Sequence, residues 1–400
     1  MFIGNEQINR MSVKDFSFYA LPEKRSMEDY EEIYQKIKNI CSKNKEVLSV
    51  YTFGEVSVLG ISDIDLIFVL RKHAKLPRFM RKARLDRSSS YILVHPFFIV
   101  TEDFMENIAY IYPTANLRLI YGKKIRIKKL PKSELNLVCQ YLVNDVILRH
   151  FPSDYLNVLL SKRINARLCL LRLNAMHHSF DIFKKISGIK KNEWAKISDE
   201  VEELRENWFI IPEESAKSKL VELMKRAVYV SLDFVKEYSG FIEAKVPEAK
   251  FSELLFRGVQ NRISFVKNFE VPDSLAKMMA HYNKHKNFYS LFPKSLVWQL
   301  CAYSSAKGPL SYYISKRMDK KCAIKSMDNV LSKRIGLLNS QVEYAMKLKH
   351  SHYPCFFPLG FKNTKGLKNK LIYAYVLVKD HSLFRRAVSH VRTTLRFMPI

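Results

Sequence analysis

One helical pattern and several short apolar runs fill the first 130 residues. The stretch "SMEDYEEIYQKIKNICSKNKE" begins at Ser26, carries acids in its first turn and lysines in its last, and repeats apolar residues at helical spacing. It predicts a helix capped by Ser26. Four runs rich in β-branched and aromatic residues predict strands: "VLSVYTF", which ends at Gly54, "IDLIFVL", "YILVHPFFIV", bent or ended early by Pro96, and "LRLIYGKKIRI". Together they predict a compact mixed unit.

Beyond "KKLPKSE" at residues 128–134, the pattern changes to long helical periodicity. Four examples are "SELNLVCQYLVNDVILRH", "NVLLSKRINARLCLLRLNAM", "SKLVELMKRAVYVSLDFVKEY" and "VLSKRIGLLNSQVEYAMKLKH". We therefore expect an α+β protein. An N-terminal extension over 1–26 would precede a mixed sheet with helices over 27–130, and a mainly helical region over 131–400 would be long enough for two subdomains.

The composition adds a strong positive charge. Lysine and arginine number 67 against 39 acidic residues, which gives a net charge of +28 and predicts partners that carry phosphate or other anionic groups. A lysine-rich coding bias is the alternative explanation. The six cysteines form no CxxC pair, which favours reduced thiols over a disulfide framework. No signal peptide and no run of about 18 apolar residues is visible, so we expect a cytoplasmic protein.

Two aspartates stand at the start of the second apolar run, in "GEVSVLGISDIDLIFVL". Residues two apart on a strand share a face, so Asp63 and Asp65 would project together. Two close carboxylates repel each other unless a cation lies between them, and Mg²⁺ or Mn²⁺ prefers such oxygen ligands. Upstream, Gly54 would let a backbone turn approach a phosphate, and Ser62 could add a hydroxyl donor. A DxD by itself is more often a solvated strand end.

The longer pattern is more restrictive: a strand that ends in Gly, a short turn, then G-x-S-D-I-D-L-I-x-V. Over residues 27–130 it resembles the nucleotidyltransferase superfamily of the DNA polymerase beta type. The resemblance implies that Asp63 and Asp65 are catalytic carboxylates that bind Mg²⁺ or Mn²⁺, and that Gly54 and Ser62 contact the nucleotide. It also implies transfer of a nucleoside monophosphate from an NTP to a hydroxyl acceptor.

Two departures from that family pattern favour an alternative. Glu55 stands where the family usually has serine, and an acid there would repel a triphosphate. The family's third carboxylate has no clear match, because "YILVHPFFIV" offers His95 and no acid; Asp86, Glu102 and Asp103 are merely nearby in sequence. The alternative is a catalytically degenerate member of the fold that acts as a basic module for nucleic acid or an anionic membrane.

Two basic segments flank the aspartates in sequence. Residues 71–87 hold eight basic residues and one acid, and residues 123–132 hold six and none. A basic rim beside a metal centre would attract RNA or DNA, and less favourably an anionic membrane surface. The candidate polyanion-binding residues are Arg78, Arg81, Lys82 and Arg84. Two ordinary solvated loops are the alternative interpretation.

Overall fold

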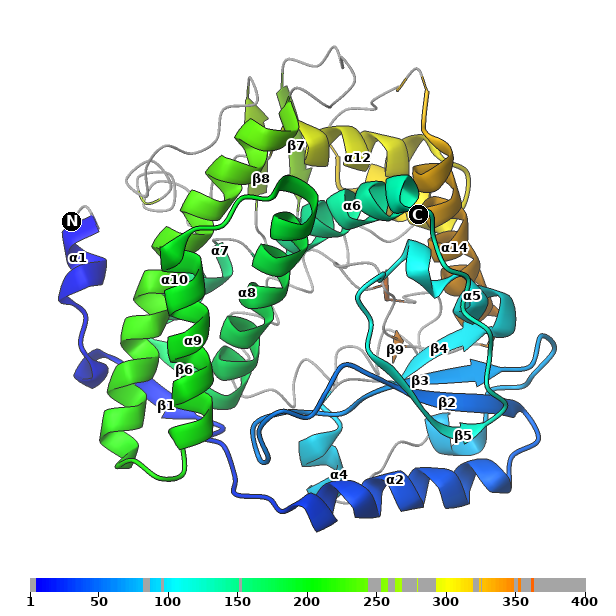
Figure 1. The fold of residues 1–400 in the computed structure, drawn as a ribbon, viewed down its shortest axis with the longest axis horizontal. Coiled ribbons are helices and arrows are strands. Elements are labelled where there is room, and N and C mark those ends of the chain that lie inside the picture. The colour runs from blue at the N-terminus through cyan, green and yellow to red at the C-terminus, as the bar shows by residue number, and fades with distance from the viewer. Residues whose placement is uncertain are drawn as a thin grey trace.

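The computed structural model describes residues 5–81, 87–94, 97–150, 153–243, 253–257, 263–267, 279, 293–318, 324, 326–348, 352–353 and 361–362. Within these residues the protein has a mixed α+β structure (Figure 1). The helices α8 (Ala166–Ser187), α9 (Asn192–Asn207) and α10 (Glu213–Glu243) lie on one side of the molecule, and the main sheet lies on the other.

The main sheet has four strands in the order β4-β3-β2-β5. β2 (Val47–Phe53) lies antiparallel to both β3 (Asp65–Leu70) and β5 (Leu117–Gly122), and β3 lies parallel to β4 (Phe98–Thr101). The apolar, β-branched composition of β2 and β3 suits these two central strands, which are buried on both faces. Two of the four predicted strands, β2 and β3, start and end close to the expected residues, whereas β5 starts as expected at Leu117 but ends at Gly122, before the predicted "KKIRI".

The helix α2 (Met27–Ser42) covers one face of the sheet (Figure 1). Its predicted start is confirmed, because the backbone N–H of Ser26 donates to Asp29 Oδ2 over 2.8 Å in a capping arrangement. Its buried residues, among them Tyr30 and Ile33, form a core with Leu66 and Phe68 of β3. The apolar face of α2 and the alternate apolar residues of β3 thus pack together as one layer.

The opposite face of the sheet packs into a larger core that continues through the helical part of the chain. Tyr51, Ile67 and Val100 lie in the same cluster as buried residues of α6 (Lys132–His150), α8, α9, α10, α12 (Lys294–Ser305) and α14 (Asn329–Lys347). The sheet is therefore fixed against the helices by one continuous apolar interior.

The remaining described elements are short or peripheral. They are α1 (Asn5–Arg10), η1 (Val13–Asp15), α3 (Arg78–Arg81), α4 (Arg87–Ile92), α5 (Glu102–Glu106), η2 (Ile108–Tyr110), α7 (Ser153–Ser161), α13 (Pro309–Ser315), and the strand pairs β1 (Ser17–Tyr19) with β6 (Arg163–Asn165), β7 (Glu253–Arg257) with β8 (Ile263–Lys267), and β9 (His352–Tyr353) with β10 (Phe361–Lys362). No helix among the described residues is both long and apolar enough to cross a bilayer.

Two further predicted elements differ from the structure. The expected strand "YILVHPFFIV" begins as the end of helix α4, and only Phe98–Thr101 pairs in the sheet. The expected continuous helix over "NVLLSKRINARLCLLRLNAM" is interrupted by β6, which pairs in parallel with β1. Asn165 then accepts a hydrogen bond from the Leu168 N–H over 2.9 Å and starts α8 anew. In both cases a partner distant in sequence decides the local structure.

Candidate functional site

The aspartates lie where β2 ends and β3 begins. Phe53 and Asp65 are the last cross-strand pair, so the loop over residues 54–64 connects two adjacent antiparallel strand ends. Gly54 has a φ of +88°, a left-handed conformation that glycine adopts without strain, and its N–H donates to the Asn116 carbonyl over 3.0 Å. The turn that the sequence predicted at Gly54 is confirmed.

The residues around the start of β3 alternate between the two cores on either side of the sheet. Ile64 and Leu66 lie in the core beneath α2, whereas Ile67 and Val69 lie in the larger core shared with the helices. Asp65 belongs to the same face as Ile67 and Val69, and Asp63 precedes it by two residues. Asp63 Oδ2 and Asp65 Oδ1 are both buried. Asp65 therefore belongs to the face that the helical part of the chain approaches, and Asp63 lies close enough to Tyr30 of α2 and Arg205 of α9 for its charge to favour a higher pKa of both.

The hydroxyl of Ser62 holds the loop together. Ser62 is buried, and its Oγ accepts hydrogen bonds from the backbone N–H groups of Ser57 over 3.2 Å and Val58 over 3.1 Å. The Ser62 N–H donates in turn to the Val58 carbonyl over 2.8 Å. These bonds bend the loop back on itself and fix the residue directly before Asp63. A nucleotide contact by this hydroxyl, as the resemblance implies, would compete with them.

Two residues outside the motif bind the backbone of the same loop. The Tyr30 hydroxyl donates to the Ser62 carbonyl over 2.8 Å and accepts from the Gly60 N–H over 3.0 Å. Arg167 of α8 donates to the Ile61 carbonyl over 2.9 Å and to the Ser62 carbonyl over 3.1 Å. Arg167 also lies over the Tyr91 ring at 3.9 Å, a cation–π contact. No spacing in the sequence indicates that these residues belong to the site.

A third residue, Arg205 of α9, reaches the loop from the helical side. Its guanidinium donates to Ser57 Oγ over 2.9 Å, to Ser62 Oγ over 3.2 Å and to Asn174 Oδ1 of α8. Arg205 is buried, which lowers its pKa, while the negative charges of Glu202, Asp63 and Glu206 oppose that change. Asp63 thus lies within electrostatic range of a buried cation that the sequence analysis did not single out.

The candidate third carboxylates have separate positions. Glu55 is exposed and accepts a hydrogen bond from the Asn116 amide. Because β3 and β4 are parallel and Leu70 pairs with Thr101, Glu102 and Asp103 follow the far end of the sheet, about 16 Å along the strand from Asp65. Glu102 pairs there with Lys123 over 2.8 Å.

β4 itself holds no acid, and Asp86 and His95 lie outside the described residues. Among the described residues, no three His, Cys, Asp or Glu side chains form a group that could hold a metal ion.

The two basic segments begin at the far end of the sheet. Residue 71 follows Leu70 at the end of β3, and residue 123 follows Gly122, which pairs with Ser49 near the start of β2. Further along the chain, the end of α4 lies beside the aspartates, because the Ile64 N–H donates to the Ile92 carbonyl over 3.1 Å. Arg78 and Arg81 belong to α3, whereas Lys82 and Arg84 lie outside the described residues.

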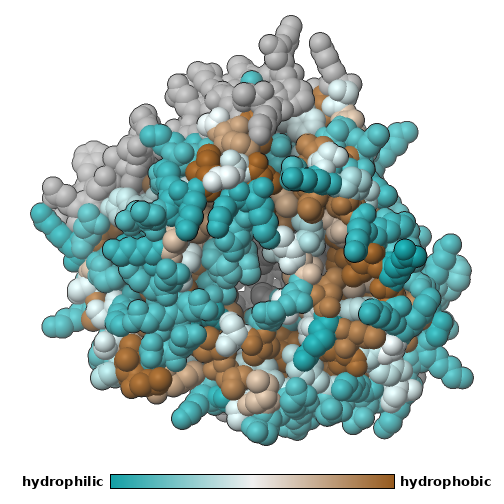
Figure 2. Space-filling model, viewed as in Figure 1, coloured by the Kyte–Doolittle hydropathy of each residue, from teal (hydrophilic) through white to brown (hydrophobic). Residues whose placement is uncertain are grey.

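The molecular surface is hollowed between the sheet and the helices α8–α10 (Figure 2). The loop over residues 54–64 on the sheet side is contacted from the helical side by Arg167 of α8 and Arg205 of α9. This arrangement could hold a divalent cation between carboxylates and a ligand between the sheet and the helices. No family model matches the chain, and neither the curated proteins nor the solved structures gave a match.

Proposed function

We propose that this protein is a metal-dependent nucleotidyltransferase that moves a nucleoside monophosphate from an NTP to a hydroxyl acceptor. The observation that supports the proposal is the position of Asp65 at the first residue of β3, opposite Phe53 and beside the left-handed Gly54 turn, with Asp63 two residues before it. The α+β structure, with a mixed sheet that has α2 on one face, is compatible with the proposal.

The residues fit a magnesium or manganese ion of the kind such enzymes use. Mg²⁺ commonly binds one or two protein carboxylates and completes its shell with water and substrate phosphates. Asp63 and Asp65 would supply the protein ligands, and Tyr30, Ser62 and Arg167 hold the loop that precedes them. When bound, the ion would activate the acceptor hydroxyl and stabilise the leaving pyrophosphate.

Replacing both aspartates tests the proposal. The variant Asp63→Asn/Asp65→Asn keeps the volume of each side chain but removes both negative charges, so we expect it to lose Mg²⁺-dependent NTP binding by calorimetry. Glu31→Gln/Glu32→Gln, on the exposed surface of α2, is the matched control and should bind as the parent does. An unchanged NTP affinity in the aspartate variant, or no affinity in the parent, would contradict the proposed activity.

A second candidate function rests on the absence of an acid from β4 and on Glu55 beside the glycine turn. In that case the protein would be a nucleotidyltransferase fold without catalysis that binds nucleic acid or an anionic membrane through its basic surface. Turnover distinguishes the two: incubation with radiolabelled NTPs and RNA or DNA ends should yield labelled acceptor if the protein is the enzyme, and polyanion binding without label if it is the binding module.

A further inference from the structure

The short helix α13 presents an aromatic ring to solvent. Tyr312 is 51% exposed, although its neighbours Leu310 and Ile314 are buried. The other exposed large hydrophobic residues of the described part of the chain are Met27, Val94 and Ile210, none of them aromatic and none on the helices that pack against α13. Large aromatic rings dominate the energetics of interfaces when a partner covers them. The ring of Tyr312 is therefore a candidate contact for a ligand.

The backbone that carries this ring is fixed against α14. Asn339 Oδ1 accepts a hydrogen bond from the Leu310 N–H over 2.9 Å, and Asn339 Nδ2 donates to the Lys307 carbonyl over 2.9 Å. Gly308 has a φ of +123°, and a Cβ atom built on it would lie 2.7 Å from Asn339 Cγ. Two hydrogen bonds and a close backbone approach thus hold the start of α13 in place. A ring on a fixed support loses less conformational entropy when a ligand binds to it.

The charge around the ring is positive. The Tyr312 N–H donates to the Gly308 carbonyl over 3.2 Å, and the Lys316 N–H donates to the Tyr312 carbonyl over 3.1 Å, so one helical turn lies on each side of the ring. Lys307, next to Gly308, and Lys316 are both exposed. Lys316 Nζ lies 5.4 Å from the centroid of the Tyr312 ring, a cation–π contact. Residues 293–318 hold four basic residues and no Asp or Glu.

Single-stranded nucleic acid fits this combination better than other polyanions do. Each of its bases has a face that can stack on an aromatic ring, and its phosphates attract lysines. In a duplex the bases are already stacked on one another and must be extruded before a side chain can cover them. Membrane-surface helices bury a broad apolar face with several large side chains, whereas Tyr312 is the one exposed residue of α13.

We propose that Tyr312 is a stacking platform for a base of single-stranded nucleic acid, and that Lys307 and Lys316 bind the adjoining phosphates. Such a platform would serve a nucleotidyltransferase and a binding module without catalysis equally well. Because stacking uses the face of a base and not its edge, the platform should show little sequence preference.

The test measures fluorescence anisotropy of two labelled strands with the full chain: an oligothymidylate of about 12 nucleotides, within the range of single-strand sites, and an abasic strand with the same number of phosphates. Tyr312→Ala should weaken oligothymidylate binding by about 5- to 150-fold, the effect of one stacked base, and leave binding of the abasic strand unchanged. Tyr312→Phe keeps the ring and should bind as the parent does. Met27→Ala, which truncates a residue that is 52% exposed on α2, is the matched control.

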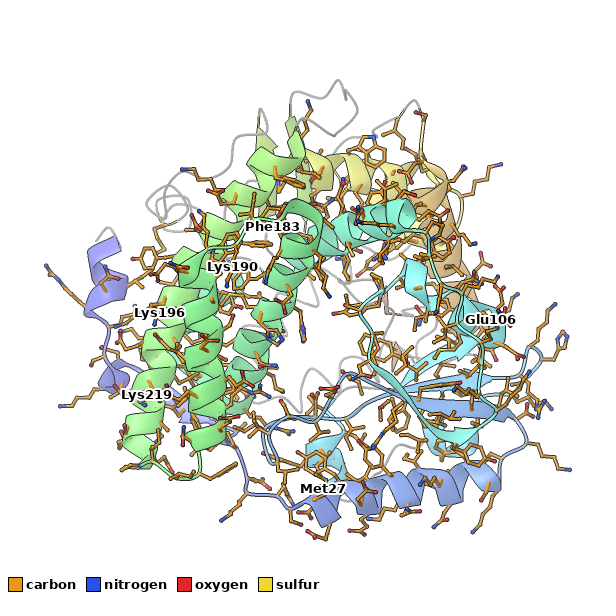
Figure 3. The ribbon with its side chains drawn as sticks, viewed as in Figure 1. Met27, Glu106, Phe183, Lys190, Lys196 and Lys219 are labelled. Carbon is orange, nitrogen blue, oxygen red and sulfur yellow. The ribbon has the colours of Figure 1, made fainter. Side chains whose placement is uncertain are left out.

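The lysines give a second comparison. Lys307→Met/Lys316→Met should weaken binding of both strands and remove about 0.7 per lysine from the slope of log affinity against log salt. Lys190→Met/Lys196→Met, at two exposed lysines labelled in Figure 3, should leave both slopes unchanged. Equal oligothymidylate affinity of Tyr312→Ala and the parent, or equal affinity of the parent for the two strands, would overturn the platform. Binding restricted to vesicles that contain phosphatidylserine would overturn it as well. In each of these cases Mg²⁺-dependent NTP binding, measured separately, decides the proposed function.

Discussion

Gly60 lies where the 54–64 loop packs against the backbone of Glu23 in the N-terminal segment. Its φ is +80°, and a Cβ atom built on it would lie 2.3 Å from the Glu23 carbonyl oxygen. Tyr30 and Tyr91 both bind its backbone, through the N–H and the carbonyl respectively. The loop therefore depends on a residue without a side chain at this point, and the position of Asp63 depends on the loop.

Gly60→Ala should lower the free energy of unfolding by about 1–3 kcal/mol, because alanine is strained at positive φ and its methyl group would overlap a backbone oxygen. Gly240→Ala is the control: Gly240 lies within α10 with nothing near its Cβ position, and alanine should stabilise that helix by up to about 1 kcal/mol. Urea unfolding measures both values. Equal stability of the two variants would contradict this account of the loop.

Among the elements, those with their own periodic pattern were predictable. The helix over Met27–Ser42 and the strands β2, β3 and β5 follow from capping residues and apolar spacing. The sequence pattern failed where contacts distant in sequence decide the structure. Tyr91, expected in a strand, ends a helix and binds Glu23 and Gly60 through its hydroxyl. The motif likewise predicted Asp63 and Asp65 but not Arg167 or Arg205, which enter the site from more than 100 residues away.

The helix α14 is tied to α6 and η2 by a buried ion pair. Arg334 of α14 donates to Asp145 Oδ2 of α6 over 2.5 Å and to the carbonyls of Tyr110 and Ile111 over 2.8 and 2.7 Å. Gln299 Nε2 of α12 donates to the other Asp145 oxygen over 2.8 Å. Both charged groups are out of contact with solvent. The guanidinium of Arg334 and the carboxylate of Asp145 neutralise each other, so removal of either side chain leaves the other as an unpaired buried charge.

Arg334→Met should therefore destabilise the protein by about 3–5 kcal/mol, because it leaves Asp145 charged and unpaired in the core. The double variant Asp145→Asn/Arg334→Met should be less destabilised than the sum of the single variants, since neither charge remains. Lys347→Met, at an exposed position on the same helix, should change stability by less than about 0.5 kcal/mol. If the destabilisation of the double variant equals the sum of the two single variants, Asp145 and Arg334 have no coupling free energy, which would contradict this account.

At the scale of the whole molecule, sequence proximity proved a poor guide to the surroundings of the site. The segments at 71–87 and 123–132 flank the aspartates along the chain, but both begin at the opposite end of the sheet. The helices α8 and α9, remote in sequence, contribute the cations that contact the loop. A net charge of +28 still favours association with polyanions.

Changing Arg78, Arg81, Lys82 and Arg84 to alanine should weaken binding of RNA or DNA and flatten its salt dependence. Each lost phosphate contact should remove about 0.9 from the slope of log affinity against log salt for duplex DNA and about 0.7 for single strands. The control changes four exposed lysines to alanine, namely Lys190, Lys196 and Lys219, all labelled in Figure 3, and Lys236. Both variants lose four positive charges. A smaller salt slope in the arginine and lysine variant of the 71–87 segment, but not in the control, would show that this segment contacts the phosphates. Equal slopes in both would assign the association to net charge alone, and binding restricted to anionic vesicles would favour a membrane surface.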